Sequence, residues 1–397
     1  MGIDPNDADT CNNLGCTFKE ARRTDEAEQR FRQALAIDPK HPQALFNLGN
    51  LLANSGRVLE AVPLLELSVA VRPEWAEAHF SLGSALHDLG DLDRAVTSYR
   101  HALAIAPNYI LAHVCLGLSL LLHGDWIAGW EEYEWRWRAK EFRDTLPGPP
   151  EQRWDGSELV GRDILVFAEQ GLGDTLQFVR YLPLLHLGSR QVFLQCQPPL
   201  KRLLSSIEGA DVVIGTDDPP PRFDCYVPLM SLARMFETTP AHIPGKSVYL
   251  SADTALRHRW KPRLPDHGLR VGLAWAGNPE KTKDCFRSMP LAALAPLGRV
   301  PGASLVSLQP EPQASELRAA GLPITDIGSK LGDFADTAAV VSQLDLVITV
   351  DTAVAHLAGA MVNRSGFFCP PHLTGVGWPA ADRPNGMSMR GSSGSSA

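Results

Sequence analysis

The segment HPQALFNLGNLLANSGRVLEAVPLLELSVAVRP, residues 41–73, sets a pattern that returns along the first third of the chain. Residues of the same type recur every 34 positions on both sides of it. Glycines keep this step at Gly15, Gly49, Gly83 and Gly117, and prolines keep it at Pro5, Pro39, Pro73 and Pro107. Large apolar residues and alanines hold the same register, so a chance amphipathic bundle is a poor explanation.

A step of 34 residues with this pattern is typical of the tetratricopeptide helical hairpin. One hairpin cannot bury its apolar face alone, so neighbouring hairpins stack and stabilise one another. We therefore predict an N-terminal α-solenoid over residues 1–140. The architecture suggests a concave face that takes a protein or peptide partner.

Composition and charge narrow the class of protein. A chain of 397 residues is too long for one ordinary core. The net charge of -8 and the lack of a basic patch argue against a nucleic-acid partner. No apolar run is long enough to span a bilayer, which predicts no transmembrane segment. The absence of a secretory pattern and of any CxxC pair predicts a cytoplasmic protein.

An aromatic segment, WIAGWEEYEWRWR, ends the repeats at residues 126–138. Four of its aromatic residues fall on one helical face: Trp126, Trp130, Tyr133 and Trp137. We interpret this face as a buried seam that caps the last repeat and fixes it against the next domain. The alternative is an exposed aromatic platform for a sugar or a peptide. Residues 141–162 then form a proline-rich linker, whose stiffness suggests a defined domain orientation.

Beyond the linker, apolar runs of strand length alternate with helical patterns, which indicates parallel α/β sheets. Two such sets predict two domains, at residues 163–250 and 268–361. The expected strands are 163–168, 191–196, 211–214 and 225–228 in the first set, and 270–275, 304–309 and 346–350 in the second. The helical patterns between them include one at residues 291–297. Ligands of such sheets bind at the carboxyl ends of the strands.

The first candidate strand end is AEQGLGDTLQF, residues 168–178. Gly171 and Gly173 would let the backbone approach a ligand closely, and Asp174 opens the next helix. The spacing matches neither a dinucleotide fingerprint nor a P-loop. Taken alone, Asp174 is explained more simply as a helix N-cap.

The second strand end is AWAGNPEKTKDCFRS, residues 274–288. Asn278 is expected in a turn after the strand. Lys281 and Arg287 would bring positive charge to the carboxyl end of that strand. The forked guanidinium of Arg287 is suited to a diphosphate. A solvated basic loop is the alternative interpretation.

The third strand end is TVDTAVAHLAGAM, residues 349–361. Asp351 and Thr352 begin a helix whose first N–H groups could bind phosphate oxygens. Asp351 itself would repel phosphate and suits a sugar hydroxyl or a cap. For His356, one turn inside the helix, a packed core histidine is the simpler interpretation.

Together, the phrases WEEYEWRW, AEQGLGDTLQFVRYLP, AWAGNP and VDTAVAHLAGA resemble the bacterial glycosyltransferases related to the heptosyltransferases of lipopolysaccharide synthesis, glycosyltransferase family 9-like. The subgroup with tetratricopeptide repeats ahead of the transferase region is the most similar, over about residues 7–361. The resemblance implies a GT-B fold, in which two Rossmann-like domains hold a nucleotide-sugar donor between them. The expected fold class is therefore α plus α/β.

The resemblance also assigns roles to residues. It implies that Asp174 is the general base, that Lys281 or Arg287 meets the diphosphate, and that Asp351 and Thr352 form the donor-binding turn. The remaining candidates for the nucleotide sugar are Gly171, Gly173, Asn278 and His356. Cationic side chains can take the diphosphate and no DxD-type pair stands at a strand end, so we expect an inverting transferase that needs neither metal nor cofactor.

Two departures from the family keep a second reading open. Lys281 stands where the subgroup usually shows histidine. Residues 362–397 show neither strand alternation nor helical period and are rich in Gly, Ser and Pro near their end, so we expect a disordered tail and an incomplete C-terminal part. The alternative function is a non-catalytic tetratricopeptide scaffold with a degenerate transferase region.

Overall fold

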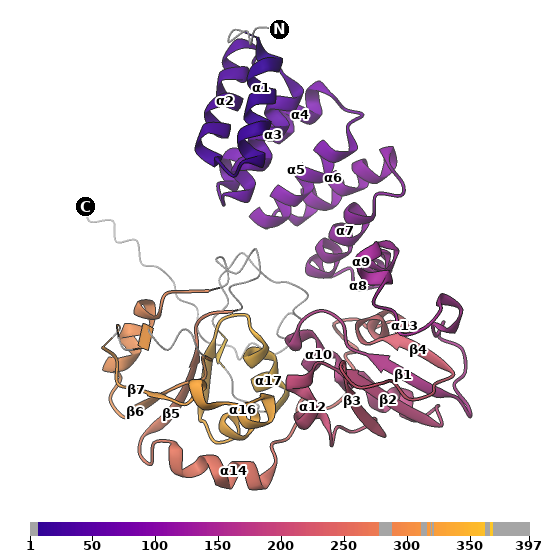
Figure 1. The fold of residues 1–397 in the computed structure, drawn as a ribbon, viewed down its shortest axis with the longest axis vertical. Coiled ribbons are helices and arrows are strands. Elements are labelled where there is room, and N and C mark those ends of the chain that lie inside the picture. The colour runs from indigo at the N-terminus through magenta and orange to yellow at the C-terminus, as the bar shows by residue number, and fades with distance from the viewer. Residues whose placement is uncertain are drawn as a thin grey trace, which may run out of the picture.

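The computed structural model describes residues 7–277, 288–310, 316, 317, 319, 321–361, 366 and 367. A helical array leads into two parallel β-sheets, each flanked by helices (Figure 1). Three of the expected site residues, Asn278, Lys281 and Arg287, lie outside the described residues, as does all of the predicted tail except residues 366 and 367.

The array is built from helical hairpins, as the repeat predicts. Its helices are α1 (Ala8–Glu20), α2 (Thr24–Ile37), α3 (Pro42–Asn54), α4 (Val58–Val71), α5 (Ala76–Leu89), α6 (Leu92–Ile105), α7 (Ile110–His123) and α8 (Trp126–Tyr133). The repeating glycines explain how closely the paired helices approach. A Cβ on Gly49 would lie 2.7 Å from Leu65 Cγ, and one on Gly83 would lie 2.8 Å from the Tyr99 ring. Only glycine leaves room for these large side chains to pack.

Local sequence also fixes the turns within later hairpins. Gly90 and Gly124 end α5 and α7 in the left-handed region, with φ of 84° and 101°, a conformation that glycine adopts without steric cost. Asp91 and Asp125 follow them directly. Their carboxylates accept from the backbone N–H groups of Arg94 and Ala128, both at 3.4 Å, and so cap the next helices.

The aromatic seam joins the array to the first sheet. After α8 the chain continues through η1 (Glu134–Arg138) and α9 (Lys140–Arg143). Trp126, Trp130 and Tyr133 are buried in the same apolar cluster as residues of the first sheet and its helices. The Trp130 ring meets Phe178 edge-on, with centroids 5.7 Å apart. The interpretation of these residues as a buried seam is confirmed.

The first sheet has the strand order β3-β2-β1-β4, and all its pairs are parallel. Its strands are β1 (Asp163–Phe167), β2 (Gln191–Cys196), β3 (Val212–Gly215) and β4 (Cys225–Pro228), and its α-helices are α10 (Leu172–Phe178), α11 (Leu182–His186), α12 (Pro198–Leu204) and α13 (Leu232–Met235). All four predicted strands are present. Every residue of β1 is buried, which suits a central strand covered on both faces.

The second sheet is also parallel, in the order β7-β6-β5-β8-β9. Its strands are β5 (Leu269–Ala274), β6 (Ala303–Ser307), β7 (Ile324–Asp326), β8 (Leu346–Thr349) and β9 (Gly366–Phe367), and its α-helices are α14 (Thr254–Trp260), α16 (Phe334–Val341) and α17 (Ala353–Met361). The sequence pattern missed β7, which is too short to show alternation. Residues 291–297, expected to be α-helical, form the 3₁₀ helix η7 (Leu291–Arg299), and Pro296 within it lacks the N–H that an α-helix needs.

Short 3₁₀ turns complete the described elements: η2 (Pro150–Gln152), η3 (Val179–Tyr181), η4 (Leu229–Ser231), η5 (Lys261–Arg263) and η8 (Gly328–Lys330).

Helices from the two sheets pack on each other, α10 against α17 and α12 against α16 (Figure 1). Arg202 of α12 joins this contact by ion pairs to Asp333 at 2.7 Å and Asp336 at 2.9 Å. In the described part of the chain, no helix combines the length and apolar character needed to cross a bilayer.

Candidate functional site

The turn after β1 brings Asp174 to the start of α10. Gln170 has φ of 65°, in the left-handed region that non-glycine residues seldom occupy. The N–H of Gly171 then donates to Asp174 Oδ2 at 2.8 Å. The helix begins at Leu172, so Gly171 is the N-cap and Asp174 is the third helical residue. Our simpler interpretation of Asp174 as the N-cap is therefore wrong in position, although its carboxylate does bind the backbone at this helix start.

Gly173 places this turn against the second sheet's helix α17. A Cβ on Gly173 would lie 2.6 Å from His356 Cδ2 and 3.2 Å from His356 Nε2. His356 is half-buried, and its Nε2 lies 3.9 Å from Asp351 Oδ1. The structure therefore brings Gly171, Gly173 and Asp174 of the first half together with Asp351 and His356 of the second. His356 lies at the contact between the two halves rather than in a closed core.

The start of α17 is ordered by threonine hydroxyls. Thr349 Oγ1 donates to the Val350 carbonyl at 2.8 Å and lies 3.1 Å from Thr352 Oγ1. The Ala355 N–H donates to the Thr352 carbonyl at 2.9 Å, which begins the helical hydrogen bonds. Asp351 is partly exposed at this point. The helix start thus has a fixed backbone and an accessible acidic side chain.

Gly277 and Ser288, which flank the basic segment 278–287, lie close together beyond the carboxyl end of β5. The Gly277 N–H donates to Ser288 Oγ at 3.0 Å, and the Met289 N–H donates to the Trp275 carbonyl at 2.9 Å. Gln309 Oε1 accepts from the N–H of Trp275 at 3.2 Å. Since β5 and β8 are parallel neighbours, Gly277 and Ser288 lie at the same sheet edge as the start of α17.

Sequence reasoning missed a buried ion network beside the first turn. The Arg136 side chain is 1% exposed. Its Nη2 donates to Glu169 Oε1 at 2.8 Å and to Ser231 Oγ at 3.1 Å, and its Nη1 donates to Glu134 Oε1 at 2.8 Å. Arg153 pairs with the same Glu134. The signal that could have revealed the network is the presence of Glu134 and Arg136 within an aromatic seam, because buried charges need partners.

Burial and pairing set the charges in this network. Burial raises the pKa of Glu169 to about 7, although the Arg136 guanidinium opposes that shift. Burial also opposes ionisation of Glu134, but Arg136 and Arg153 together hold the pKa of that carboxyl below its ordinary value. Glu169 precedes Gln170, whose Nε2 donates to Tyr133 Oη at 3.2 Å. The end of the array is therefore bonded to the residues that lead into the Gly171–Asp174 turn.

Across the described residues, no group of three or more His, Cys, Asp or Glu side chains is arranged to hold a metal ion.

Comparison with known proteins identifies the array. Sequence models described as "Tetratricopeptide repeat" and "TPR repeat" match residues 19–86 and 83–124. The prediction of tetratricopeptide repeats, a protein-interaction architecture, is confirmed. Among curated proteins, FlbA of Caulobacter vibrioides is 27% identical over 275 residues, which cover 61% of this chain and 45% of FlbA. The chain thus spans less than half the length of the curated relative it matches.

Solved structures similar to this chain align with about a third of it. MamA (41-end) from Desulfovibrio magneticus RS-1 is 23% identical and covers 36% of this chain and 79% of its own, with a TM-score of 0.32. The first TPR of Spaghetti (RPAP3), bound to an HSP90 peptide, is 22% identical and covers 29% of this chain and 92% of its own, with a TM-score of 0.28.

Proposed function

We propose that the α/β half transfers a sugar from a nucleotide diphosphate sugar to an acceptor hydroxyl, and that the repeats bind a protein or peptide. The observation that carries the proposal is the contact of Gly173 with His356. It sets the turn that holds Asp174 against the helix that begins beside Asp351. Both elements follow the carboxyl ends of parallel strands, where such sheets bind ligands.

Strand order supports a pair of Rossmann-like domains in a GT-B arrangement. The orders β3-β2-β1-β4 and β7-β6-β5-β8-β9 both place the first strand of the set centrally, with the next two strands on one side and the fourth on the other. This is the order of doubly wound nucleotide-binding sheets, and the reversal point beside the first strand is where their ligands lie. In the first set that point coincides with the candidate turn 168–174, and in the second with residues 274–277, where the candidate segment 274–288 begins.

The residue types fit an inverting transfer. Asp174 would take the proton of the acceptor hydroxyl as that oxygen attacks the anomeric carbon. The bond from that carbon to the diphosphate breaks through an oxocarbenium-like state. The N–H groups at the start of α17, with Lys281 and Arg287 from the basic loop, would stabilise the departing diphosphate. These cationic groups do the work that a metal ion does in other transferases.

The array supports the role of a docking surface. Stacked repeats form extended concave faces, and the TPR of RPAP3 is bound to an HSP90 peptide. We propose that the present array holds a protein acceptor or a protein partner of the transferase. The competing function is a scaffold in which only the repeats are active.

Calorimetric titration with a panel of nucleoside diphosphates tests the proposal. We expect saturable binding of at least one of them at one site per chain. Asp174→Asn should leave this binding near normal, because the base acts on the acceptor and not on the diphosphate. Replacing Thr352 by valine should weaken binding, because its hydroxyl helps to order the helix start. No heat of binding across the panel would contradict the transferase and favour the scaffold.

A further inference from the structure

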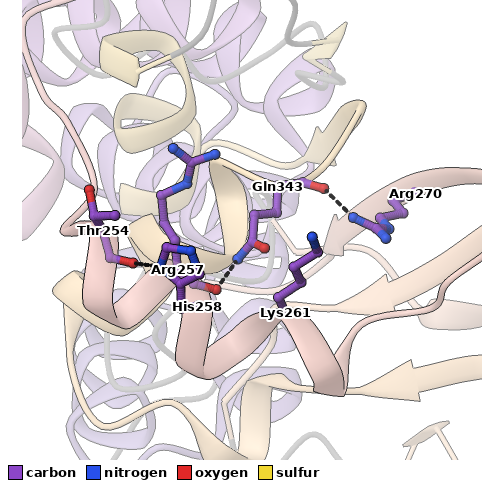
Figure 2. Close-up of a pocket in the computed structure, with 6 residues that line it drawn as sticks. All are labelled: Thr254, Arg257, His258, Lys261, Arg270 and Gln343. Atoms are coloured by element: carbon purple, nitrogen blue, oxygen red, sulfur yellow. Dashed lines mark hydrogen bonds between the residues drawn. The ribbon is translucent and has the colours of Figure 1, made fainter.

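A pocket of about 360 Å³ lies beside α14, away from the candidate site. It is lined by Thr254, Arg257, His258, Lys261, Arg270 and Gln343. Figure 2 shows these residues, which come from α14 with its 3₁₀ extension, from the start of β5 and from the segment after α16. The lining contains three permanent cations and no carboxylate.

The cations of this pocket lack a paired carboxylate in the part of the chain that the structure describes, although Arg270 is one of the causes that lower the pKa of the exposed Asp266. Among the described residues, no carboxylate forms an ion pair with the side chains of Arg257, Lys261 or Arg270. Asp345 lies nearby, but its Oδ2 accepts from the backbone N–H of Arg270 at 2.8 Å. Three cations without an ion-pair partner among the described residues therefore line one pocket, in a chain of net charge -8.

Two pocket residues are held in place. The Arg270 guanidinium donates through Nε to the Pro265 carbonyl at 2.7 Å and through Nη1 to the Gln343 carbonyl at 3.3 Å. Gln343 Nε2 donates to the carbonyls of Arg257 at 3.0 Å and Ala339 at 2.9 Å. The two Arg270 bonds use only some of the N–H groups of its guanidinium, and the remaining N–H groups can donate to a ligand. A fixed guanidinium loses little freedom when it binds an oxyanion.

Arg257 and Lys261 stand four residues apart, on one side of α14 and its extension. Like charges at this spacing repel each other, so an anion between them would relieve the repulsion. Thr254, one turn earlier, adds a hydroxyl at the same side. The set of two guanidiniums, one ammonium and a hydroxyl is the donor set that binds tetrahedral phosphate oxygens.

We propose that this pocket binds a phosphate group, carried by a small molecule or by a lipid headgroup. The site is separate from the donor site proposed above. Arg270 is the second residue of β5 and Gln343 precedes β8, so the pocket lies at the amino edge of the second sheet. Asp351 and Gly277 lie at the carboxyl edge, at the other end of the same strands. A phosphate bound here would therefore not be the diphosphate of the sugar donor.

Titration of the full chain with inorganic phosphate and with pyrophosphate, at constant ionic strength, tests the site. The pocket variant is Arg257→Gln/Lys261→Gln. The control is Arg259→Gln/Arg299→Gln, which removes the same charge at exposed positions outside the pocket. We expect saturable binding to the wild type and the control, and binding at least about tenfold weaker in the pocket variant, since each charge-assisted bond is strong. Thermal melting checks that both variants fold.

A second arm separates the two sources of phosphate. Flotation with phosphatidylcholine vesicles, with and without phosphatidylglycerol, measures binding to a headgroup. Capture by the anionic vesicles alone, lost in the pocket variant and kept in the control, assigns the site to lipid. Saturable binding of the free anions without vesicle capture assigns it to a small molecule. The proposal is wrong if neither probe binds saturably, or if both double variants lose binding equally.

Discussion

Removing Arg136 should destabilise the protein in a strongly pH-dependent way. Its guanidinium is buried between Glu134 and Glu169, at 2.8 Å from each. Breaking a buried pair by deleting one partner costs about 3–5 kcal/mol, because the other charge is left without compensation. Arg136→Met keeps much of the side-chain volume, so the cost should come from the stranded carboxylates and little from a cavity. Glu134 keeps Arg153 as a partner, so Glu169 is the carboxyl that loses its cationic partner in the variant.

The pH dependence follows from the direction of the Glu169 shift. Burial raises its pKa from 4.5 to about 7 in the folded protein. A carboxyl with a raised folded pKa binds more protons when folded than when unfolded between these values, so the stability it affects falls as pH rises through that window. The shift corresponds to a loss of about 3 kcal/mol between pH 4.5 and pH 7. Without Arg136 the pKa of Glu169 rises further. The carboxyl is then protonated at pH 5 in both proteins, whereas above pH 7 the variant loses about 1.4 kcal/mol per pH unit that the wild type keeps.

Urea unfolding followed by fluorescence at pH 5 and pH 8 measures this effect. We expect Arg136→Met to lose about 3–5 kcal/mol at pH 8 and about 1.4 kcal/mol less than that at pH 5. The double variant Arg136→Met/Glu169→Gln should recover most of the loss at pH 8, because a neutral amide replaces the stranded carboxylate. An equal loss at both pH values, or no recovery in the double variant, would refute the assignment of the effect to Glu169.

Three further predictions concern the active turn and the array. Asp174→Asn should lower sugar transfer by roughly two to four decades while leaving donor binding near normal, and unchanged turnover would remove Asp174 from the mechanism. A fragment of residues 1–140 should be helical and melt cooperatively, because repeats are stabilised by their neighbours; a coil-like circular dichroism spectrum would show that the array depends on the α/β half. Gly117→Ala should destabilise the array by about 2–3 kcal/mol despite the better helix propensity of alanine, since its Cβ would lie 2.7 Å from the Tyr133 backbone nitrogen. Gly83→Ala is the matched control and should cost less, because the nearest atoms to its Cβ belong to the Tyr99 side chain and not to the backbone.

Much of the fold could be predicted from the sequence because its periods are explicit. The step of 34 residues fixed the hairpins, and apolar runs bounded by turn residues located all four strands of the first sheet. The pattern failed where an element is too short to show a period, as in β7, or where Pro296 converts an expected α-helix into a 3₁₀ helix.

The candidate site was predictable only in part. Turn residues such as Gly171 and Asp351 stand out at strand ends, but the pairing of Gly173 with His356 depends on how two helices from different sheets pack. The Arg136–Glu169 pair joins residues far apart in sequence. No local pattern encodes such a contact. The α14 pocket combines residues from three segments, and most of its lining lies on α14, between the two domains that the sequence predicted.

The position of the buried network bears on how the two halves of the protein act together. Arg136 and Tyr133 belong to the end of the array, yet they bond to Glu169 and Gln170, which directly precede the turn that holds Asp174. Trp130 of α8 packs on Phe178, the last residue of α10. The array is therefore bonded and packed against both ends of the segment that forms the proposed acceptor side of the site. A flexible tether would let a docked partner sample many positions. Attachment through this buried contact instead gives a partner held by the repeats a defined position relative to Asp174, as a docked acceptor requires for its hydroxyl to reach the base.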